Sequence, residues 1–578
     1  MYKRQALDWL VIGVFFLALI GIIVWVVRQK QNDSADYFLG GRDATWLAIG
    51  ASIFASNIGS EHLIGLAGAG ASSGMAMAHW EIQGWMILIL GWVFVPFYTR
   101  SMVYTMPEFL ERRYNPQSRT ILSVISLVSY VLTKVAVTVY AGGLVFQQVF
   151  GIKELWGIDF FWIAAIGLVV LTALYTIFGG MKSVLYTSVL QTPILLLGSL
   201  IILVLGFKEL GGWDEMMRVC GAVTVNDYGD TMTNLIRSND DANFPWLGAL
   251  IGSAIIGFWY WCTDQFIVQR VLSGKNEMEA RRGTIFGAYL KLLPVFLFLI
   301  PGMIAFALHQ KYIGAGGEGF LPMLANGTAN ADAAFPTLVA KLLPAGVKGL
   351  VVCGILAALM SSLASLFNSS AMLFTIDFYK RFKPETPEKK LVGIGQIATI
   401  VIVVLGILWI PIMRSVGDVL YTYLQDVQSV LAPGIAAAFL LGICWKRTSA
   451  QGGMWGLISG MVIGLTRLGA KVYYSNAGEV ADSTFKYLFY DMNWLFFCGW
   501  MFLFCIIVVI VVSLATEAPT AEKIQGLVFG TATKEQKAAT RASWNHWDII
   551  HTVIILAITA AFYWYCLLYT SPSPRDCS

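Results

Sequence analysis

The chain has 578 residues, of which 57% are hydrophobic and 13% are charged, and its formal net charge is +4. Soluble domains carry about 25% charged residues, so this composition excludes a soluble globular protein and predicts a polytopic membrane protein. The scattered cysteines show no metal-binding or redox spacing, which argues against a metal centre held by thiolates.

Apolar stretches long enough to cross a bilayer follow one another along the whole chain. A membrane helix needs about 20 apolar residues. In chain order we expect fourteen spans, at roughly 9–27, 45–72, 78–99, 120–150, 160–178, 184–207, 245–264, 284–309, 347–379, 391–413, 418–444, 453–472, 494–515 and 549–568. The first is expected to be a retained span and not a cleaved signal peptide. The ends MYKRQ and SPSPRDCS do not match the style of the chain, and we expect the tail 569–578 to be non-native.

Lysine and arginine are distributed unevenly between the two sets of loops. If the amino terminus is outside, the inner loops hold 23 of the 39 basic residues, with the densest cluster at 380–390. Cytoplasmic loops are enriched in Lys and Arg. The pattern therefore predicts a multi-pass protein of a bacterial inner membrane or eukaryotic cell membrane, with both termini outside. Segment 516–548 is expected to be a surface helix, and Asn326 to begin a glycosylation sequon on the outer side.

The second span contains the most unusual sequence, ASIFASNIGSEHLIGLAGAG at 51–70. Its polar members are Ser52, Ser56, Asn57, Ser60, Glu61 and His62. Unpaired polar groups in hydrocarbon cost several kcal/mol each. A helix that breaks in mid-span around a buried ion or solute accounts for them. Close packing of small residues is the alternative, but it leaves Glu61 unexplained, because an intramembrane carboxylate is usually functional.

Further charged residues lie inside predicted spans. Glu81, Lys134 and Lys291 join Glu61 there, and each charge costs at least ~2.5 kcal/mol at mid-membrane. They therefore need one another, water or a ligand. Two acids and two bases nearly cancel, which suits a neutral substrate rich in hydroxyls, and a structural ion-pair network is the alternative. Four aromatic residues fit either an interfacial belt or a surface that stacks on a sugar ring: Trp80, Tyr260, Trp261 and Tyr421.

The ninth span predicts a small oxygen cage. Ala358, Ser361 and Ser362 are spaced at i, i+3 and i+4, so they share one helical face. Two hydroxyls, with backbone carbonyls freed by a nearby helix break, favour Na⁺ over a divalent ion because no carboxylate is present. Plain packing of small residues remains open as an alternative.

Two blocks of five spans, 2–6 and 7–11, predict an inverted repeat, since an odd number of spans per block inverts the second. Each block begins with a span that carries polar residues and glycines in mid-membrane, and substrate and ions are expected at the repeat interface. The expected divisions are an N-terminal extra helix at 1–36, repeat 1 at 37–207, an extracellular loop at 208–244, repeat 2 at 245–445 and C-terminal extra helices at 446–568.

Eight runs of residues, in the same order along the chain, carry a resemblance to a known family. They are ASNIGSEHLIGLAG, WEIQG, YTMPEFLERRY, ALYTIFGGMKSVLYT, WYWCTDQFIVQR, YLKLLP, SSLASLFNSSAMLFTIDFY and YLQDVQSVLAPGIAA, and they cover most of 37–445. Through them the sequence resembles the sodium/solute symporter family, in its sodium/glucose (galactose) cotransporter branch. The resemblance implies an all-α, LeuT-like five-plus-five inverted repeat with one extra helix before it and three after it.

The resemblance also implies roles for individual residues. Sodium would be held by the carbonyls of Ala55, Ile58 and Ala358 and by the hydroxyls of Ser361 and Ser362. The substrate-binding positions would be Asn57, Glu61, His62, Glu81, Tyr260, Lys291 and Gln425, with Trp261 nearby. The gates would be Leu66, Trp80 and Tyr421 on the outer side and Tyr260 on the inner side. Ser188 stands where relatives proposed to use a second sodium often have Asp, so we expect one sodium per substrate.

The expected function is sodium-driven import of a neutral monosaccharide of the glucose or galactose type by alternating access. Within the family, myo-inositol, amino acids, sialic acid and vitamins are rival substrates, although Glu61 argues against carboxylates. A sugar-gated sensor or channel of the same fold is an alternative from another class. An enzyme is disfavoured, because the sequence contains no metal cluster, nucleophile motif or adjacent catalytic pair.

Overall fold

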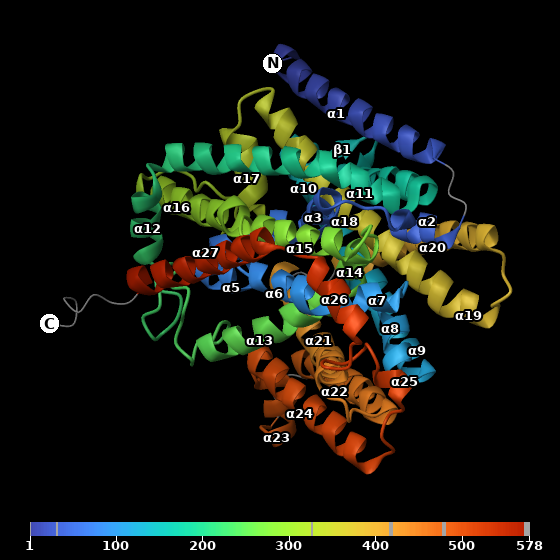
Figure 1. The fold of residues 1–578 in the computed structure, drawn as a ribbon. Helices are drawn as coiled ribbons and strands as arrows, with labels where there is room; N and C mark the ends of the chain where they lie inside the picture. Colours follow the sequence, from blue (N-terminus) through green and yellow to red (C-terminus); the bar gives the residue numbers. More distant parts are fainter. Residues whose placement is uncertain are drawn as a thin grey trace.

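The computed structural model describes residues 2–29, 33–59, 61–324, 327–414, 420–476 and 481–570. Three sequence-based expectations lie outside these residues, namely those on Ser60, on Asn326 and on the last eight residues of the tail. The described chain is predominantly helical (Figure 1). Its paired strands are β1 (Glu154–Leu155) and β2 (Ile158–Asp159), which form a short antiparallel hairpin.

The helices follow one another along the chain in a regular succession, in which η marks a short 3₁₀ or π-helical turn. The first part contains α1 (Tyr2–Arg28), α2 (Ser34–Leu39), η1 (Gly40–Arg42), α3 (Trp46–Asn57), η2 (Glu61–Leu66), α4 (Ala67–Ser73), η3 (Gly74–Met77), α5 (Ala78–Glu81), α6 (Gly84–Ile89), η4 (Leu90–Phe94), α7 (Val95–Ser101), α8 (Met106–Arg113), α9 (Pro116–Ser129), η5 (Tyr130–Val135), α10 (Ala136–Phe150), α11 (Phe160–Leu210) and α12 (Trp213–Gly221). The middle part contains α13 (Trp246–Phe258), η6 (Trp259–Thr263), α14 (Gln265–Leu272), α15 (Glu277–Lys291), η7 (Val295–Leu299), α16 (Ile300–Gly314), η8 (Ala331–Ala333), α17 (Ala334–Leu342), α18 (Val347–Met372), η9 (Leu373–Tyr379), α19 (Lys380–Phe382), α20 (Glu388–Arg414) and α21 (Leu420–Cys444). The last part contains α22 (Ala450–Asn476), α23 (Thr484–Lys486), η10 (Tyr487–Asp491), α24 (Trp494–Ala515), α25 (Ala521–Ile524), α26 (Lys534–Ala542) and α27 (His546–Thr570).

The described helices can be divided among the fourteen spans expected from the sequence. Eleven helical stretches there are long and apolar enough to cross a membrane. One of them, α11, has 51 residues and would be ~77 Å long if straight, more than twice the hydrocarbon thickness. It breaks at Gly180 (φ 53°, ψ −147°) and so supplies two spans. The stretch 61–101 contains the second half of span 2 and all of span 3, and α22 adds one further long helix.

Span 2 and span 7 are both interrupted in the middle, as the sequence predicted. In span 2, α3 ends at Asn57, Ile58 is extended (φ −79°, ψ 102°), and the chain becomes helical again at Glu61. In span 7, η6 ends at Thr263 and Asp264 is extended (φ −76°, ψ 127°) before α14 begins. The two breaks have similar dihedral angles and fall in the first span of each repeat. Each break frees backbone groups in the interior of the bundle.

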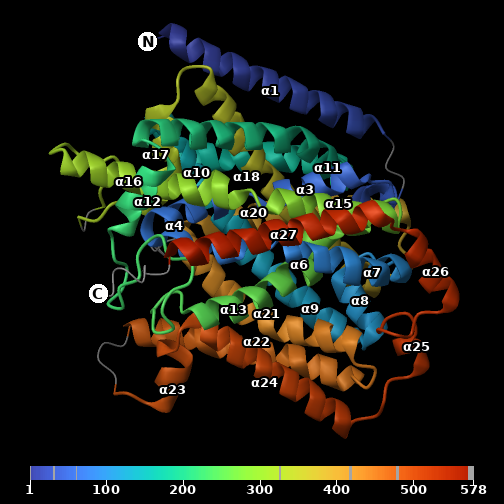
Figure 2. The same ribbon diagram turned by 60° about the vertical axis from the view of Figure 1, so that its left-hand side comes forward.

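The interrupted helices occupy the centre of the molecule, and the extra helices lie at its periphery. Helix α3 packs against α15, α11 and α18. Both ribbon views place α1 along one edge and the α22 and α24 pair along the opposite edge (Figures 1 and 2). These outer helices expose large apolar side chains such as Leu17 and Ile507, as expected where a helix faces lipid.

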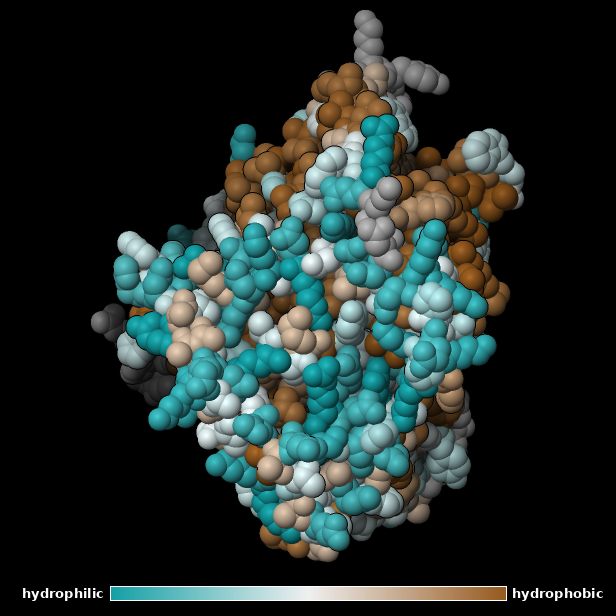
Figure 3. All heavy atoms as spheres, turned by 45° about the vertical axis from the view of Figure 1, so that its right-hand side comes forward, coloured by the Kyte–Doolittle hydropathy of each residue, from teal (hydrophilic) through white to brown (hydrophobic). Residues whose placement is uncertain are grey.

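The predicted inner loops meet on one polar face. The Lys523 ammonium donates to the carbonyl of Glu111 at 2.8 Å, and Arg381 donates to the Thr120 hydroxyl at 2.5 Å. Figure 3 shows this face as a broad hydrophilic field bordered by hydrophobic residues. Segment 516–548 contributes α25 and α26 to it, which agrees with the surface helix expected there. The contacts place these basic loops together, as the charge distribution predicted.

Candidate substrate and ion sites

A small cavity lies between the two interrupted spans, and all the predicted substrate residues line it. Its volume is about 30 Å³, enough for one or two water molecules and much less than a monosaccharide. The lining residues are Asn57, Glu61, His62, Trp80, Glu81, Gln83, Ile256, Gly257, Tyr260, Trp261, Lys291, Gln425 and Gln428. A solute of sugar size therefore binds here only after these side chains separate. All eight positions predicted for substrate binding are in this set.

A continuous polar network crosses the cavity wall from span 3 to span 7. The Lys291 ammonium donates to the Glu81 carboxylate at 2.6 Å and to the Asn57 side-chain oxygen at 3.2 Å. The Asn57 amide in turn donates to the Tyr260 hydroxyl at 3.1 Å. The His62 ring lies 3.1 Å from Glu81. Since the charges of Glu81 and Lys291 compensate each other, the wall offers polar contacts without a net charge from that pair.

Three buried polar atoms of the cavity lining have no hydrogen-bond partner among the described residues. They are His62 Nδ1, Trp80 Nε1 and Gln425 Oε1. Leaving a buried polar atom unpaired costs about 1–3 kcal/mol, so such atoms in one cavity call for a ligand that pairs with them. Trp80 is a donor and Gln425 offers an acceptor. A hydroxyl group, which both donates and accepts, satisfies either of them.

The predicted gate residues occupy different environments. Trp80 stacks on Trp494 with ring centroids 5.5 Å apart, and Phe244 meets its edge at 6.1 Å, so aromatic rings cover one side of the cavity. Tyr260 lines the cavity directly. Leu66 is buried in η2 but does not line this cavity. The side chain of Tyr421 lies outside the described part of the chain.

Lys134 makes its ion pair with a residue outside the four charged positions named from the sequence, although its charge also acts on Glu61. Its ammonium lies 2.7 Å from the Asp264 carboxylate, at the break of span 7. The rings of Tyr260 and Phe266 face it at 4.7 and 4.8 Å. Cation–π contacts of this kind contribute about 0.5–2 kcal/mol each. Lys134 therefore belongs to an ion pair that fixes span 4 against span 7.

Of the two serines predicted to hold sodium, Ser362 contacts the broken end of α3 and Ser361 contacts span 6. The Ser362 hydroxyl donates to the carbonyls of Ser56 at 2.9 Å and Ile58 at 3.3 Å. The Ser361 hydroxyl lies 3.3 Å from that of Ser188. Ala55 and Ala358, the other two predicted ligands, are almost fully buried in α3 and α18. The donor set is made of neutral oxygens, which fits a hard monovalent cation such as Na⁺.

Gly59 allows this close approach. A β-carbon on Gly59 would lie 2.6 Å from the Ser362 hydroxyl oxygen and 3.2 Å from its Cβ. The first distance is too short for non-bonded atoms and the second is tight, so a side chain at this position requires Ser362 to rotate or shift. A glycine at the break therefore lets α18 bring its serines against the freed carbonyls of α3.

Several residues of the two sites were missed by the site predictions. Gln83 donates to the Ser253 carbonyl at 2.8 Å behind the cavity, and it is part of the WEIQG run. Gln428 follows Gln425 by three residues, a spacing that places both on one helical face. Trp494, which stacks on Trp80, is beyond the second repeat. The sequence contained a signal for the two glutamines but none for the tryptophan.

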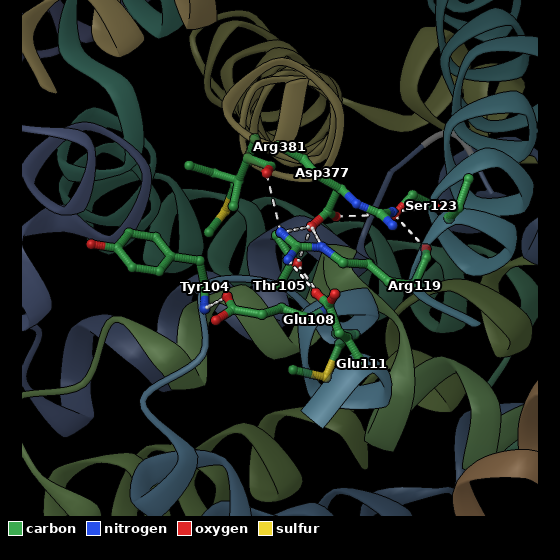
Figure 4. A network of polar contacts seen from close by, with 12 residues as sticks. Tyr104, Thr105, Glu108, Glu111, Arg119, Ser123, Asp377 and Arg381 are labelled. Atoms are coloured by element: carbon green, nitrogen blue, oxygen red, sulfur yellow. Dashed lines mark hydrogen bonds and ion pairs between the residues drawn. The ribbon is translucent and has the colours of Figure 1, made fainter. Parts of the chain in front are cut away.

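A buried ion pair joins the ends of spans 4 and 9 at the polar face. Figure 4 shows Asp377 at the centre of the network. Arg119 approaches its carboxylate to 2.6 Å, the Thr105 hydroxyl donates to it at 2.8 Å, and the Ser123 hydroxyl at 3.1 Å. The Asp377 side chain has no exposed surface. Loop 102–105, α9 and η9 are therefore held together at this face.

Comparison with known proteins shows which family has this architecture. The sequence model of the sodium:solute symporter family matches residues 37–460. The sodium/myo-inositol cotransporter 2 of Homo sapiens is 36% identical over 538 residues, which cover 91% of this chain and 79% of that protein. The sodium/glucose cotransporter 1 of Ovis aries is 37% identical over 533 residues, covering 89% and 79%. A solved structure of a Na⁺-coupled sialic acid symporter, in a substrate-bound outward-open state, has a TM-score of 0.70 at 21% identity and covers 89% of this chain and 99% of that chain.

A helical membrane protein with two inverted repeats, each opened by a broken span beside a buried polar cavity, is a LeuT-like secondary transporter. The chain belongs to the sodium:solute symporter family. It is a multi-pass, sodium-coupled solute symporter, and Na⁺ is its coupling ion. The resemblance seen in the sequence, the LeuT-like fold and the sodium coupling are thereby confirmed.

Proposed function

We propose that the protein imports a neutral monosaccharide of the glucose or galactose type together with Na⁺. The observation that carries the proposal is the cavity itself. Its closest ion pair, Glu81 with Lys291, is charge-compensated, and three of its buried polar atoms lack partners in the described chain. A ligand with several hydroxyl groups and no charge matches such a lining.

The proposed binding positions follow the sequence-based assignment. The substrate contacts are Asn57, Glu61, His62, Glu81, Tyr260, Trp261, Lys291 and Gln425, and the sodium ligands are Ala55, Ile58, Ala358, Ser361 and Ser362. Ser188 offers a hydroxyl at 3.4 Å from Ser52 and no carboxylate, which supports one sodium per substrate. A reversal-potential measurement that gives two sodium ions per sugar contradicts this stoichiometry.

The proposed mechanism is alternating access around the two interrupted spans. Sodium binds between α3 and α18 from outside and favours the outward-open form, and the sugar then binds to the completed site. Coupling requires that each ligand bind one conformation more tightly than the other. The sodium gradient and the membrane potential, ~2.3 kcal/mol per charge per 100 mV, drive transport. The basic face is the cytoplasmic side in this proposal, and the repeats are 37–207 and 245–445.

A second candidate substrate is myo-inositol. The human sodium/myo-inositol cotransporter 2 is as similar to this chain as the sheep sodium/glucose cotransporter 1. Both solutes are neutral six-membered rings that carry several hydroxyl groups, and the unpaired atoms of the cavity suit either. The two candidates differ in the ring oxygen, the exocyclic hydroxymethyl group and the hydroxyl pattern but not in charge, so competition between them in the uptake assay separates them.

The test is uptake of labelled solutes into proteoliposomes that contain the purified protein. The panel includes glucose, galactose, myo-inositol, sialic acid and a neutral amino acid, each with an inward sodium gradient and with potassium in its place. We expect concentrative uptake of a hexose only with the sodium gradient. Preferential uptake of myo-inositol selects the second candidate. Sugar binding without concentrative uptake identifies a sensor or channel and contradicts symport.

A further inference from the structure

An apolar groove lies between α1 and α11, and it shares no lining residue with the substrate cavity. One wall is the face of α1 from Phe16 to Arg28, the other is α11 from Leu171 to Phe178, and Met360 of α18 forms the floor. The groove has a volume of about 480 Å³. Both walls belong to membrane spans and expose large apolar side chains to the surroundings, including Ile20 and Leu174.

The polarity of the groove changes sharply along its length. Among the described residues that line it, Arg28 is the only charged one, and it is the last residue of α1. Tyr175 also lines the groove, but its hydroxyl donates to the Met360 carbonyl at 2.9 Å. Along the rest of its length the groove therefore offers contacts suited to a hydrocarbon chain and not to a polar solute.

A second cation lies at the charged end. The chain passes from the α11 wall through Gly180, which reverses it, and Lys182 follows two residues later. The Lys182 ammonium donates to the side-chain oxygen of Gln29, the neighbour of Arg28, at 3.3 Å. Within the described residues, neither Arg28 nor Lys182 has a carboxylate within ion-pair distance. Two cations without such a partner thus flank the polar end of an apolar groove.

We propose that this groove binds an anionic phospholipid, with one acyl chain between α1 and α11 and its headgroup phosphate between Arg28 and Lys182. The groove suits a lipid better than a free phosphate, because apart from Arg28 and Tyr175 its lining side chains are apolar. Each Lys or Arg near an anionic lipid surface contributes about 1 kcal/mol. A zwitterionic lipid with the same chains fills the groove but presents no net charge to the two cations.

The direct test uses the full-length purified protein and native mass spectrometry. Dioleoyl phosphatidylglycerol and dioleoyl phosphatidylcholine are titrated separately, and the dissociation constant of the first bound lipid is measured. We expect a preference for phosphatidylglycerol of about thirtyfold, which corresponds to about 2 kcal/mol for two cations. The double variant Arg28→Gln with Lys182→Gln should lower that preference to about threefold or less.

Two further variants separate this site from non-specific attraction. Lys389→Gln with Lys390→Gln removes the same charge from two exposed residues of α20 on the same face, away from the groove, and should leave the preference unchanged. Ile20→Trp fills the groove without changing its charge and should weaken binding of both lipids. Equal affinities of the unmodified protein for the two lipids overturn the proposal. It is also overturned if the α20 double variant loses as much of the preference for phosphatidylglycerol as the Arg28 and Lys182 double variant. Gel filtration and thermal unfolding check that each variant is folded.

Discussion

Ser362 is the side chain on which the proposed sodium site depends most directly. Its hydroxyl meets two carbonyls at the broken end of α3, so it connects span 9 to the discontinuity of span 2. We expect Ser362→Ala to raise the sodium concentration for half-maximal uptake at least tenfold. One lost ligand to a charged group corresponds to about 1.5–3 kcal/mol. The measurement is sodium titration of solute uptake at constant ionic strength.

Ser370 provides a matched control for that substitution. It lies on the same helix, α18, is fully buried, and its hydroxyl has no partner among the described residues. Ser370→Ala should leave the sodium dependence unchanged. If both alanine variants shift the sodium curve equally, the effect comes from altered helix packing, and Ser362 is not a ligand.

Gln425 belongs to the solute side of the site. Its unpaired side-chain oxygen lies in the cavity wall, and we expect it to accept a hydrogen bond from a substrate hydroxyl. Gln425→Ala should raise the KM for the transported solute about five- to tenfold, since a hydrogen bond contributes about 0.5–1.5 kcal/mol. The sodium curve should change little at saturating solute. A variant with normal KM and altered sodium affinity places Gln425 at the ion site instead.

At the scale of single elements, the break of span 2 lies against α18, and Gly59 permits the close contact between them. A methyl group there meets the Ser362 hydroxyl, so the serine has to rotate away from the carbonyls of Ser56 and Ile58, or one of the two helices has to shift. We expect Gly59→Ala to reduce sodium-driven uptake at least tenfold while the protein still inserts and folds. Gly13→Ala on α1 is the control, because its β-carbon meets no atom within 4 Å. Full sodium-dependent activity of Gly59→Ala contradicts the importance of this contact.

The interruption of span 2 could be predicted from sequence because polar residues are costly in an apolar run, whatever their partners are. The partners themselves could not be predicted. Lys134 and Asp264 are 130 residues apart. The charged residues named from the sequence lie in four different spans, and the sequence did not indicate which of the possible ion pairs has the lowest free energy. Gly59 and Ser362 illustrate the same limit. The sequence indicated that Gly59 suits a helix break and that Ser362 suits an oxygen cage. Only the packing of α3 against α18 shows that the two residues are in contact.

Tertiary packing also decided what the aromatic residues do. The sequence allowed Trp80 to be a belt anchor or a ring that covers a solute, and stacking on Trp494 places it over the cavity. Trp494 begins α24, which lies outside both repeats. One of the helices added to the basic fold thus takes part in closing the site, a role that no motif within the repeats signals.

At the scale of the whole molecule, alternating access requires that the two sides of the membrane open in turn. On the proposed inner side, the buried ion pair of Arg119 and Asp377 joins α9 to η9. Breaking such a pair by removing one partner costs about 3–5 kcal/mol. An inward-open form in which this pair is separated carries that cost, so the pair favours the form that is closed inside.

We therefore expect Arg119→Gln to shift the population toward the inward-open form. Cys262, fully buried beside Tyr98, reports the shift in a background where Cys444 and Cys577 are replaced by serine. Labelling of Cys262 by a membrane-impermeant maleimide in inside-out vesicles should become at least tenfold faster. Arg112→Gln removes an exposed ion pair of the same face, which contributes about 0–1 kcal/mol, and should leave the rate unchanged. Equal labelling rates of Cys262 in the background protein, in Arg119→Gln and in Arg112→Gln would show that the buried ion pair does not control opening.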